Sequence, residues 1–386
     1  MKITELRVHV VDVYRTNLVL VELQVDDGSV GVGEATLEYK EQAVVGALND
    51  IRDAVVGSDA RNVTRLLEEL YRGSYWRTGP VLNSALSAIE MCLMDLNARS
   101  LDVPVHRLLG GTVRDGVQAY ANGWFAGART PDDFARAAVA TVARGFQGLK
   151  LDPFGSAYLT IDHAALDRAV SVLGAVRDAV GPSIDVLVEA HGRFSPTTAV
   201  AIAREIAPLH IFWFEEPCPP ENVDALLEVR RRSEVPIAAG ERIFDRHAFS
   251  EILRRGAVDY IQPDVSHVGG LSEVRRIADL AAMHYVAIAP HNPSGPVATA
   301  ATMHLAAALP NFRYLEIMAT DVPWRRTLTD EELVFDGGQM LIPTRPGLGV
   351  TLRPDAFGAH PYVPHPLRHY DDTLTDIRPV DAVRYF

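Results

Sequence analysis

Three glutamates recur at a constant interval in this sequence, and each one closes a short apolar run. They are Glu189 in DVLVEAH, Glu215 in IFWFEEP and Glu241 in PIAAGER, and each lies 26 residues after the one before. A β-strand with a loop, a helix and a second loop occupies about that length, so the interval predicts successive βα units of a parallel sheet. Carboxylates at three neighbouring strand ends would form a hard-cation site, which favours Mg²⁺ over zinc.

Two histidines and two further acids occupy similar positions. His191 follows Glu189 by two residues, and such neighbours in a strand point to the same side. Asp264 ends YIQPD, and His291 ends VAIAPH 27 residues later, which again matches one βα unit. A carboxylate beside an imidazole fixes its tautomer and stabilises its protonated form, which suits a general base. Glu316 ends RYLEI in the last run, and a closed barrel would bring it to the same cavity.

Each of these residues alone is explained more simply as a helix cap, a loop anchor or a hydrogen-bonded polar group. The set changes that balance, because five acids and two histidines would otherwise have to meet on one rim by accident. Burying so many like charges without a cation would cost several kcal/mol per ion. We therefore expect a metal site with acid–base residues beside it.

The elements that would position these residues form a regular series from residue 116 to 325. Strand-like runs alternate with helical segments, and the runs are QAYANGW, GLKLD, DVLVEAH, IFWFEEP, PIAAGER, YIQPDV, VAIAPHN and YLEIM. Thr130 before Pro131 is a capped helix start, and Gly145 fits the end of that segment. Eight such repeats predict an α/β protein with a closed parallel barrel, whose functional face lies at the C-terminal strand ends.

Residues 1–115 have a different pattern. ITELRVHVV, NLVLVELQV and VGVGEA alternate with the strand period, and the period becomes helical from Glu41 to about Leu109. This predicts an α+β domain. The turn-rich residues 326–386 are expected to run over the surface and pack back on that domain, with His360, His365 and His369 as surface residues because no regular spacing puts them on one face.

Composition favours a cytoplasmic metabolic enzyme. The 386 residues are 48% hydrophobic, enough to fill a barrel and a second domain. The formal net charge of −13 argues against a nucleic-acid partner. We find no apolar run of bilayer length and no signal peptide at the start, so no membrane association is expected. Cys92 and Cys218 both lie in or beside apolar stretches, so we expect buried thiols rather than a disulfide or a zinc site.

Several motifs resemble those of the enolase superfamily. They are Glu189-x-His191, FEEP at 214–217, GER at 240–242, QPD at 262–264 followed by SHVGG, PHNPSGP at 290–296 and LLGG at 108–111. Within the superfamily they look most like the mandelate racemase subgroup, and nearest to galactonate dehydratase-like sugar-acid dehydratases. The resemblance extends over essentially the whole chain.

The resemblance implies a modified (β/α)7β barrel of the TIM type with an N-terminal α+β capping domain. It implies one Mg²⁺ per subunit on Glu189, Glu215 and Glu241, and a homo-oligomer, either a tetramer or an octamer. By the same resemblance His291, paired with Asp264, removes the proton next to a substrate carboxylate. His191 then acts as the general acid that helps the β-hydroxyl leave.

The resemblance also gives Glu316 a role, as a protonated group that donates a hydrogen bond to the developing oxyanion. The product would be a 2-keto-3-deoxy acid, formed from an aldonate such as galactonate. Galactonate dehydratases often have Asp where this chain has Glu189, which leaves the exact sugar open.

The second strand of the barrel departs from the racemase pattern. Lys150-Leu151-Asp152 stands where racemases have Lys-x-Lys, so racemisation by a Lys/His pair is disfavoured. Lys150 is assigned to the catalytic group as a carboxylate-positioning residue, with pairing to Asp152 as the alternative. Candidates for sugar binding outside the metal site are Tyr14, Arg15, Trp76, Arg77, Asn122 and Trp124.

Two alternatives to dehydration stay open. An epimerase or lactone cycloisomerase would share the first proton abstraction. A catalytically idle barrel with a binding or assembly role would not need it.

Overall fold

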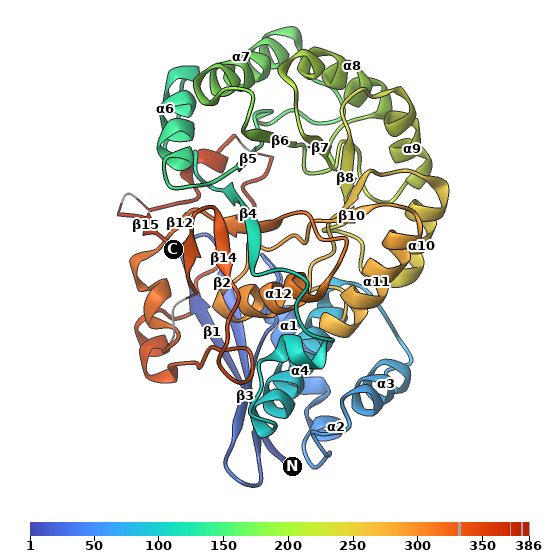
Figure 1. Cartoon of the computed structure of the whole chain (residues 1–386), viewed down its shortest axis with the longest axis vertical. Coiled ribbons are helices and arrows are strands. Elements are labelled where there is room, and N and C mark those ends of the chain that lie inside the picture. The colour runs from blue at the N-terminus through green and yellow to red at the C-terminus, as the bar shows by residue number, and fades with distance from the viewer. Residues whose placement is uncertain (331–332, 371, 380, 386) are drawn as a thin grey trace.

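Parallel strands form the centre of the larger part of the molecule (Figure 1). Within the chain that the structure describes, which is every residue except 331, 332, 371, 380 and 386, eight of them match the predicted runs. They are β4 (Gly116–Asn122), β5 (Gly148–Leu151), β6 (Asp185–Glu189), β7 (Trp213–Glu215), β8 (Ile237–Ala239), β9 (Tyr260–Ile261), β10 (Ala287–Ile288) and β11 (Leu315–Met318). Each pairs with the next as far as β10, and β11 pairs in parallel with β4. Backbone hydrogen bonds between Ile288 and residues 311 and 313 complete the closure.

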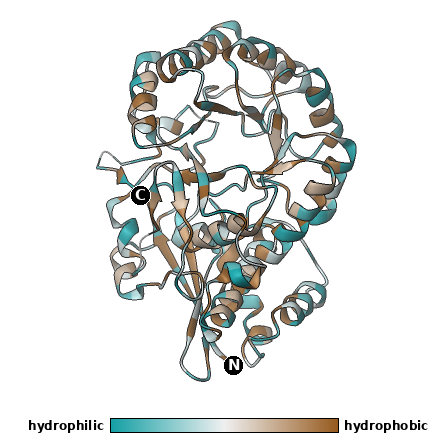
Figure 2. Cartoon of the chain, in the orientation of Figure 1, coloured by the Kyte–Doolittle hydropathy of each residue, from teal (hydrophilic) through white to brown (hydrophobic). Residues whose placement is uncertain are grey.

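A helix follows each strand except the last, so the computed structural model confirms the predicted (β/α)7β barrel. The helices are α6 (Pro131–Val142), α7 (His163–Val180), α8 (Pro196–Ile206, continued by η1, Ala207–Leu209), α9 (Val223–Arg232), α10 (Arg246–Arg255), α11 (Leu271–Met283) and α12 (Pro296–Ala308). Thr130 caps α6 as predicted, in a capping box with Asp133. Apolar faces turn inward and polar faces turn outward (Figure 2).

Large aromatic side chains fill the barrel below the catalytic face. Tyr120, Trp213 and Tyr314 are fully buried and form one apolar cluster inside the ring of strands. At the start of β6 Asp185 accepts hydrogen bonds from Tyr314 Oη at 2.8 Å and Arg313 Nη2 at 2.9 Å. Because this part of the barrel is solid, a cavity can open only at the other end, where the strands end.

The N-terminal α+β unit consists of an antiparallel sheet covered by helices. Its strands are β1 (Ile3–Asp12), β2 (Asn17–Val25) and β3 (Val30–Glu34), and its helices are α1 (Glu41–Asp50), α2 (Arg52–Val55), α3 (Val63–Gly73), α4 (Pro80–Ser100) and α5 (Val105–Leu108). Helix α4 packs so closely on β3 that a Cβ at Gly31 would lie 2.3 Å from Cys92 O, and one at Gly33 would lie 2.2 Å from Ala88 O. Only glycine permits this approach.

Two buried glutamates of this unit cap helices of the barrel. Glu34 accepts hydrogen bonds from Gly295 N at 2.6 Å and Ala298 N at 3.0 Å, where α12 begins. Glu90, on α4, accepts from Ser272 N at 3.2 Å, where α11 begins. A carboxylate is favoured there because the first backbone N–H groups of a helix lack partners inside the helix. These contacts fix the cap over the barrel.

The C-terminal segment contacts both parts of the molecule. Its elements are β12 (Thr320–Asp321), η2 (Pro323–Thr327), β13 (Phe335–Asp336), β14 (Gln339–Leu341), η3 (Pro354–Ala359), η4 (Leu374–Asp376) and β15 (Val383–Arg384). Strand β14 adds antiparallel to β4 of the barrel, a contact that the sequence did not predict. Further along, Val363 exchanges hydrogen bonds with the Asn17 side chain of the cap.

Three histidines of this segment were predicted to be surface residues; all three are partly buried, and the prediction is wrong for His369. His360 stacks on Trp324 with ring centroids 4.3 Å apart, and His365 Nε2 lies 2.6 Å from Asp12 Oδ1. His369 lines the cavity described below. The segment has no regular period because its side chains pack on several different elements in turn.

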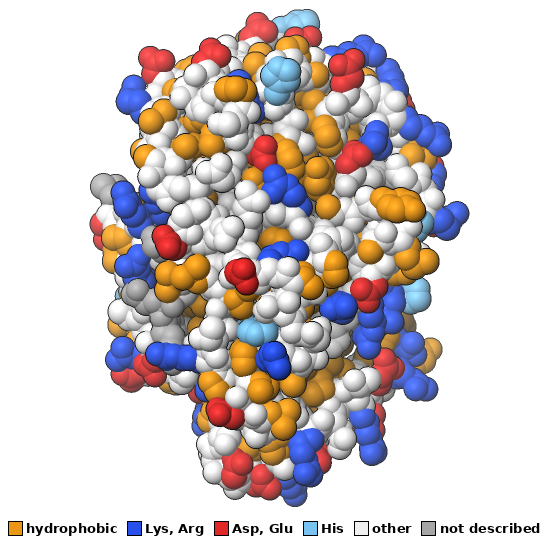
Figure 3. Space-filling view, viewed as in Figure 1, with side chains coloured by type: hydrophobic (Ala, Val, Ile, Leu, Met, Phe, Trp, Pro, Cys, Tyr) orange, Lys and Arg blue, Asp and Glu red, His pale blue; other side chains and the backbone are white. Residues whose placement is uncertain are grey.

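The outer surface carries mixed charges, with basic and acidic side chains interspersed over the face in Figure 3. Among the described helices, we find none with the length and apolar character that crossing a bilayer requires.

Candidate active site

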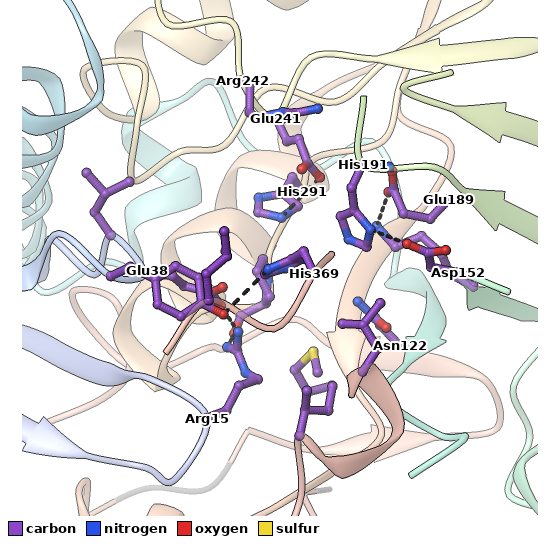
Figure 4. A pocket seen from close by; sticks show the side chains of 18 of the residues that line it. Arg15, Glu38, Asn122, Asp152, Glu189, His191, Glu241, Arg242, His291 and His369 are labelled. Carbon is purple, nitrogen blue, oxygen red and sulfur yellow. Dashed lines mark hydrogen bonds and ion pairs between the residues drawn. The ribbon is translucent and has the colours of Figure 1, made fainter. Parts of the chain in front are cut away.

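A cavity of about 340 Å³ opens at the C-terminal ends of the barrel strands, beneath the cap. Its walls come from three parts of the chain (Figure 4). The cap contributes Arg15, Glu38 and Tyr39, and the C-terminal segment contributes His369 and Tyr370. The barrel contributes most of the charged groups, which are Lys150, Asp152, Glu189, His191, Glu241, Arg242, His267 and His291. This volume lies in the usual range for small-molecule sites.

The three predicted ligands converge at the floor of the cavity. Glu189 and Glu215 end β6 and β7 and are register partners, and Glu241 follows β8 by two residues. One carboxylate oxygen of each lies within 4.8 Å of the others. Burial and the neighbouring Glu189 raise the pKa of Glu215 to about 8. The residues present fit a hard divalent cation, because the donors are all carboxylate oxygens and their mutual repulsion favours a positive ion between them.

Lys150 partly offsets this negative charge. Its Nζ atom lies 2.7 Å from Glu215 Oε1, 3.1 Å from Glu316 Oε1 and 3.3 Å from Glu189 Oε2. Burial alone would lower the pKa of Lys150, but Glu215 and Glu316 raise it well above its usual range. The alternative that Lys150 pairs with Asp152 is wrong, because Lys150 contacts the three interior glutamates, whereas Asp152, just past the end of β5, pairs with His191 and Arg193.

His191 pairs with Asp152 instead. His191 Nδ1 lies 2.6 Å from Asp152 Oδ2, and Arg193 also contacts that oxygen. Burial tends to lower the pKa of His191, but Glu189 and Asp152 raise it above its usual value. His191 adopts a left-handed backbone conformation, with φ of +48°, and its N–H donates to Glu189 Oε1 at 2.6 Å. Strained backbone of this kind concentrates at functional sites.

A second histidine–aspartate pair comes from β9 and β10. His291 Nδ1 lies 2.8 Å from Asp264 Oδ2, and its Nε2 lies 3.3 Å from Glu241 Oε2. Burial opposes the charged imidazole, but Glu241 and Asp264 together raise the pKa of His291 to about 10. Sequence analysis assigned no role to His267, whose Nε2 lies 3.4 Å from the same Asp264 oxygen and whose Nδ1 lies 3.0 Å from Ser84 Oγ.

Glu316 lies on β11 beneath the cavity, fully buried. Asn122 Nδ2 donates to its Oε1 at 2.7 Å, and Asn292 N donates to its Oε2 at 3.2 Å. Burial tends to raise its pKa, but Lys150 and His291 lower it to about 2. The prediction that Glu316 is protonated is therefore wrong for this arrangement. Hydrogen-bond donors and cations surround the group, and they favour its ionised form.

The predicted sugar-binding residues divide into two groups. Arg15 and Asn122 line the cavity, and the Arg15 guanidinium pairs with Glu38. Tyr14 and Trp124 are not among the lining residues: Tyr14 faces Arg368, and Trp124 is buried with its Nε1 donating to Lys150 O at 2.8 Å. Trp124 thus supports the strand rather than the substrate.

Trp76 and Arg77 also lie outside the cavity wall, so their assignment to sugar binding is not supported. Helix α3 ends at Gly73, and Tyr75 and Thr78 in the following loop have φ of +57° and +62°. The loop turns Trp76 outward, where its exposed fraction is 77%, and Arg77 lies over the Tyr71 ring. An aromatic–arginine pair does not by itself distinguish a sugar pocket from an exposed turn.

Sequence reasoning missed several lining residues. Asp152 was considered as a replacement for a lysine and as a partner of Lys150, although its strand-end position could have placed it beside His191. Glu38 and Tyr39 follow β3 in a loop without a motif. His369 has no local pattern, since only the tertiary path of the C-terminal segment brings it to the cavity.

Comparison with known proteins gives matches over most of the chain. Residues 3–110 match the family described as "Mandelate racemase / muconate lactonizing enzyme, N-terminal domain", and residues 133–356 match "Enolase C-terminal domain-like". The chain is 37% identical to D-gluconate dehydratase of Thermoproteus tenax, over 86% of this chain and 68% of that protein. It is 34% identical to D-galactonate dehydratase of Ralstonia nicotianae, over 86% and 87% of the two chains. The crystal structure of a mandelate racemase/muconate lactonizing enzyme from Sulfitobacter sp. superposes with a TM-score of 0.90, at 30% identity, covering 95% and 97%.

Proposed function

The chain belongs to the mandelate racemase/muconate lactonizing enzyme family of the enolase superfamily, and from this we propose that it is a hydro-lyase that dehydrates an aldonate-type sugar acid. One observation carries the proposal: two histidines, each paired with an aspartate, line the same cavity beside a cluster of three carboxylates. Relatives named D-gluconate and D-galactonate dehydratase support the substrate class.

We assign one Mg²⁺ per subunit to Glu189, Glu215 and Glu241. When bound, this ion would stabilise the second negative charge that the substrate carboxylate gains on loss of its α-proton. Lys150, which contacts two of these glutamates, would help to hold the substrate carboxylate at this end of the cavity. Glu316 and Asn122 keep Lys150 in place through the contacts described above.

His291 is the proposed general base. Glu241 is the main group that raises the pKa of His291, and a cation on the three glutamates would balance that charge and favour the neutral ring. With Nδ1–H held by Asp264, the Nε2 lone pair would then be free to accept the proton from C2 of the substrate. Nε2 also points toward Glu241, at the end of the site where the substrate carboxylate would bind. C2 is attached to that carboxylate, so the base has to face this end. Removal of this proton leaves the electron pair of the C2–H bond in an enediolate.

His191 is the proposed general acid. Asp152 holds its Nδ1, and the negative charges of Glu189 and Asp152, which raise its pKa, favour the protonated imidazole that a general acid requires. The Nε2–H would donate to the β-hydroxyl as the C3–O bond breaks, so the hydroxyl leaves as water. The resulting enol takes up a proton at C3 and becomes a 2-keto-3-deoxy acid. Protons and electrons balance without a redox partner.

Epimerisation or lactone cycloisomerisation is the second candidate, favoured by the second imidazole. Two protonatable groups beside one cavity could move a proton on and off carbon without breaking a C–O bond. A third candidate, a binding or assembly role without catalysis, would make both pairs dispensable. A tetramer or octamer would be compatible with all three.

Incubation with a set of aldonates in D₂O and Mg²⁺ separates the candidates. Dehydration predicts a 2-keto-3-deoxy acid, detected with semicarbazide and by NMR. Deuterium at C2 without any keto acid would contradict dehydration and support epimerisation. Under the assembly hypothesis the His291→Asn variant keeps the biological role of the protein, whereas the enzyme hypothesis predicts loss of turnover with metal binding retained.

A further inference from the structure

The active-site cavity has a wall that the α+β unit and the barrel do not supply. We call Leu367, His369, Tyr370, Leu374 and Ile377 the C-terminal wall, because all five line the cavity and all come from the C-terminal segment. In Figure 4 His369 lies between His191 on one side and the Arg15–Glu38 pair on the other. The histidine thus stands between the catalytic residues of the barrel and the cap.

Hydrogen bonds on several elements hold the C-terminal wall in place. Tyr370 Oη donates to His191 O at 3.0 Å, and the Arg193 guanidinium lies 5.3 Å from the centre of the Tyr370 ring. Between Leu374 and Ile377, Gly127 N donates to Thr375 O at 2.8 Å. Before the wall, His365 is bonded to Asp12 of the cap. Because the segment is anchored both before and within the wall, the wall is a built part of the cavity.

His369 presents an uncharged imidazole to this space. Its ring centre lies 4.6 Å from that of His191 at an interplanar angle of 76°, and its Nδ1 lies 3.5 Å from Tyr39 Oη. Burial, with the positive charges of His191 and Arg15, keeps the pKa of His369 well below its usual range. A neutral imidazole has one donor and one acceptor, which suits a hydroxyl group.

The order of the catalytic groups gives the direction of the substrate. Its carboxylate lies at the cluster of glutamates and Lys150, C2 lies at His291, and the hydroxyl of C3 lies at His191. The carbons beyond C3 must continue on the side of His191 that faces away from the metal ligands. His369 occupies that side, and Tyr39 contacts it there.

We propose that His369 is a specificity-determining residue, whose imidazole hydrogen-bonds hydroxyl groups of the sugar acid beyond C3. This inference rests on the proposed function, because it takes the direction of the substrate from the assigned base and acid. It assigns substrate selection partly to the C-terminal segment, in addition to the cap residues Arg15 and Tyr39.

The test compares two acids that differ only beyond C3. The probes are the six-carbon aldonate that the wild-type enzyme prefers and D-glycerate, which has a carboxylate, C2 and C3 and nothing further. Dissociation constants are measured by calorimetry on the Mg²⁺-loaded protein in an inactive His291→Asn background. Steady-state kinetics of the aldonate are measured with His291 intact.

His369→Ala is expected to weaken aldonate binding about tenfold, the loss of about one hydrogen bond to a buried group, and to leave glycerate binding within twofold. The KM for the aldonate should rise together with this dissociation constant, while kcat should change less than threefold. His369→Gln, which keeps a donor and an acceptor, should recover part of the loss. His360→Ala is the matched control, since that ring lies in the same segment but stacks on Trp324 outside the cavity, and it should change neither constant.

Equal weakening of both acids in His369→Ala and His369→Gln would overturn the proposal, because it would indicate a general effect on the fold. Unchanged aldonate binding would overturn it as well. Failure of the proposed function gives a different result, in which wild-type enzyme forms no keto acid from any aldonate. If, in addition, no six-carbon aldonate binds, both proposals are wrong.

Discussion

His191 Nδ1 lies 2.6 Å from the carboxylate of Asp152, so the imidazole on the β6 side of the cavity is held by an aspartate, as His291 is held by Asp264. Asp152 stands where racemases of this family have a lysine. The position that would carry a second base in a racemase thus holds a carboxylate that pairs with His191, the proposed acid. The two proton-transfer groups can therefore have different roles.

Asp152→Asn should separate the two halves of the reaction. We expect kcat for dehydration to fall about 100-fold or more, because His191 loses the carboxylate that orients it and stabilises its proton. Exchange of the α-proton in D₂O should continue near the wild-type rate, since His291 and Asp264 are untouched. NMR of the substrate measures both reactions. Asp264→Asn is the control and should reduce both, whereas an equal loss of both in Asp152→Asn would contradict separate roles.

Removal of the metal should abolish turnover and lower stability. Three carboxylates share one site with a single ammonium group, so the folded protein should bind Mg²⁺ strongly and the unfolded chain should not. Ligand at 100 times its dissociation constant adds about 2.7 kcal/mol to the free energy of unfolding. Thermal unfolding with EDTA and with Mg²⁺ measures the shift. The shift in thermal unfolding should disappear in Glu241→Gln. It should persist in Glu38→Gln, which alters a cavity glutamate that is not one of the three metal ligands.

Trp213 should tune the metal site from below. Its Nε1 donates to Glu215 Oε2 at 2.9 Å from inside the barrel. Loss of a group that orients a metal ligand commonly costs 10–100-fold in affinity, so Trp213→Phe should weaken Mg²⁺ binding by about tenfold. Calorimetric titration measures the change. Trp324→Phe removes a comparable hydrogen bond, to Asp12 O, and should leave the affinity unchanged. Equal Mg²⁺ affinity in Trp213→Phe and Trp324→Phe would show that the Trp213 indole contributes only packing.

Glu90 should make stability depend on pH. Burial raises its pKa to about 7, despite hydrogen bonds from Ser272. The folded state therefore holds a proton that the unfolded state releases above about pH 4.5, so stability falls as pH rises from about 4.5 to 7. The fall is on the order of 3 kcal/mol. Urea unfolding at pH 5 and pH 8 should show a smaller difference for Glu90→Gln than for wild type. The exposed Glu69→Gln is the control and should match wild type.

Local patterns predicted most of the fold and much of the site. The eight strand-like runs were found because a barrel strand is a short apolar segment, and Glu189, Glu215 and Glu241 were found because each ends one. His291 and Asp264 followed from the same repeat. These residues owe their positions to elements that are visible within a few residues of sequence.

The remaining wall residues depend on tertiary paths. His369 reaches the cavity because its segment is anchored to Asp12, His191 and Gly127, which lie far from it in sequence. Trp76 was misplaced because left-handed residues at 75 and 78 turn its loop outward, a property of backbone conformation that side-chain types did not reveal. The ionised state of Glu316 depends on Lys150, Asn122 and His291, which three other strands supply.

The pairing of Arg15 with Glu38 predicts which end group the distal part of the cavity accepts. Arg15 is largely buried, and its charge is already balanced by Glu38, so a second substrate carboxylate would meet no free cation there. We therefore expect the wild-type enzyme to prefer an aldonate, with its neutral terminal hydroxymethyl group, over the aldarate of the same sugar.

Glu38→Gln should shift that preference by releasing Arg15. The ratio of kcat/KM for aldarate to that for aldonate should rise about tenfold, which corresponds to one charge-assisted hydrogen bond. Glu38→Asp keeps the negative charge and is the matched control, with a ratio close to wild type. An unchanged ratio in Glu38→Gln would show that Arg15 does not face the distal end of the substrate, and would move the end-group contact to another side chain of the cavity.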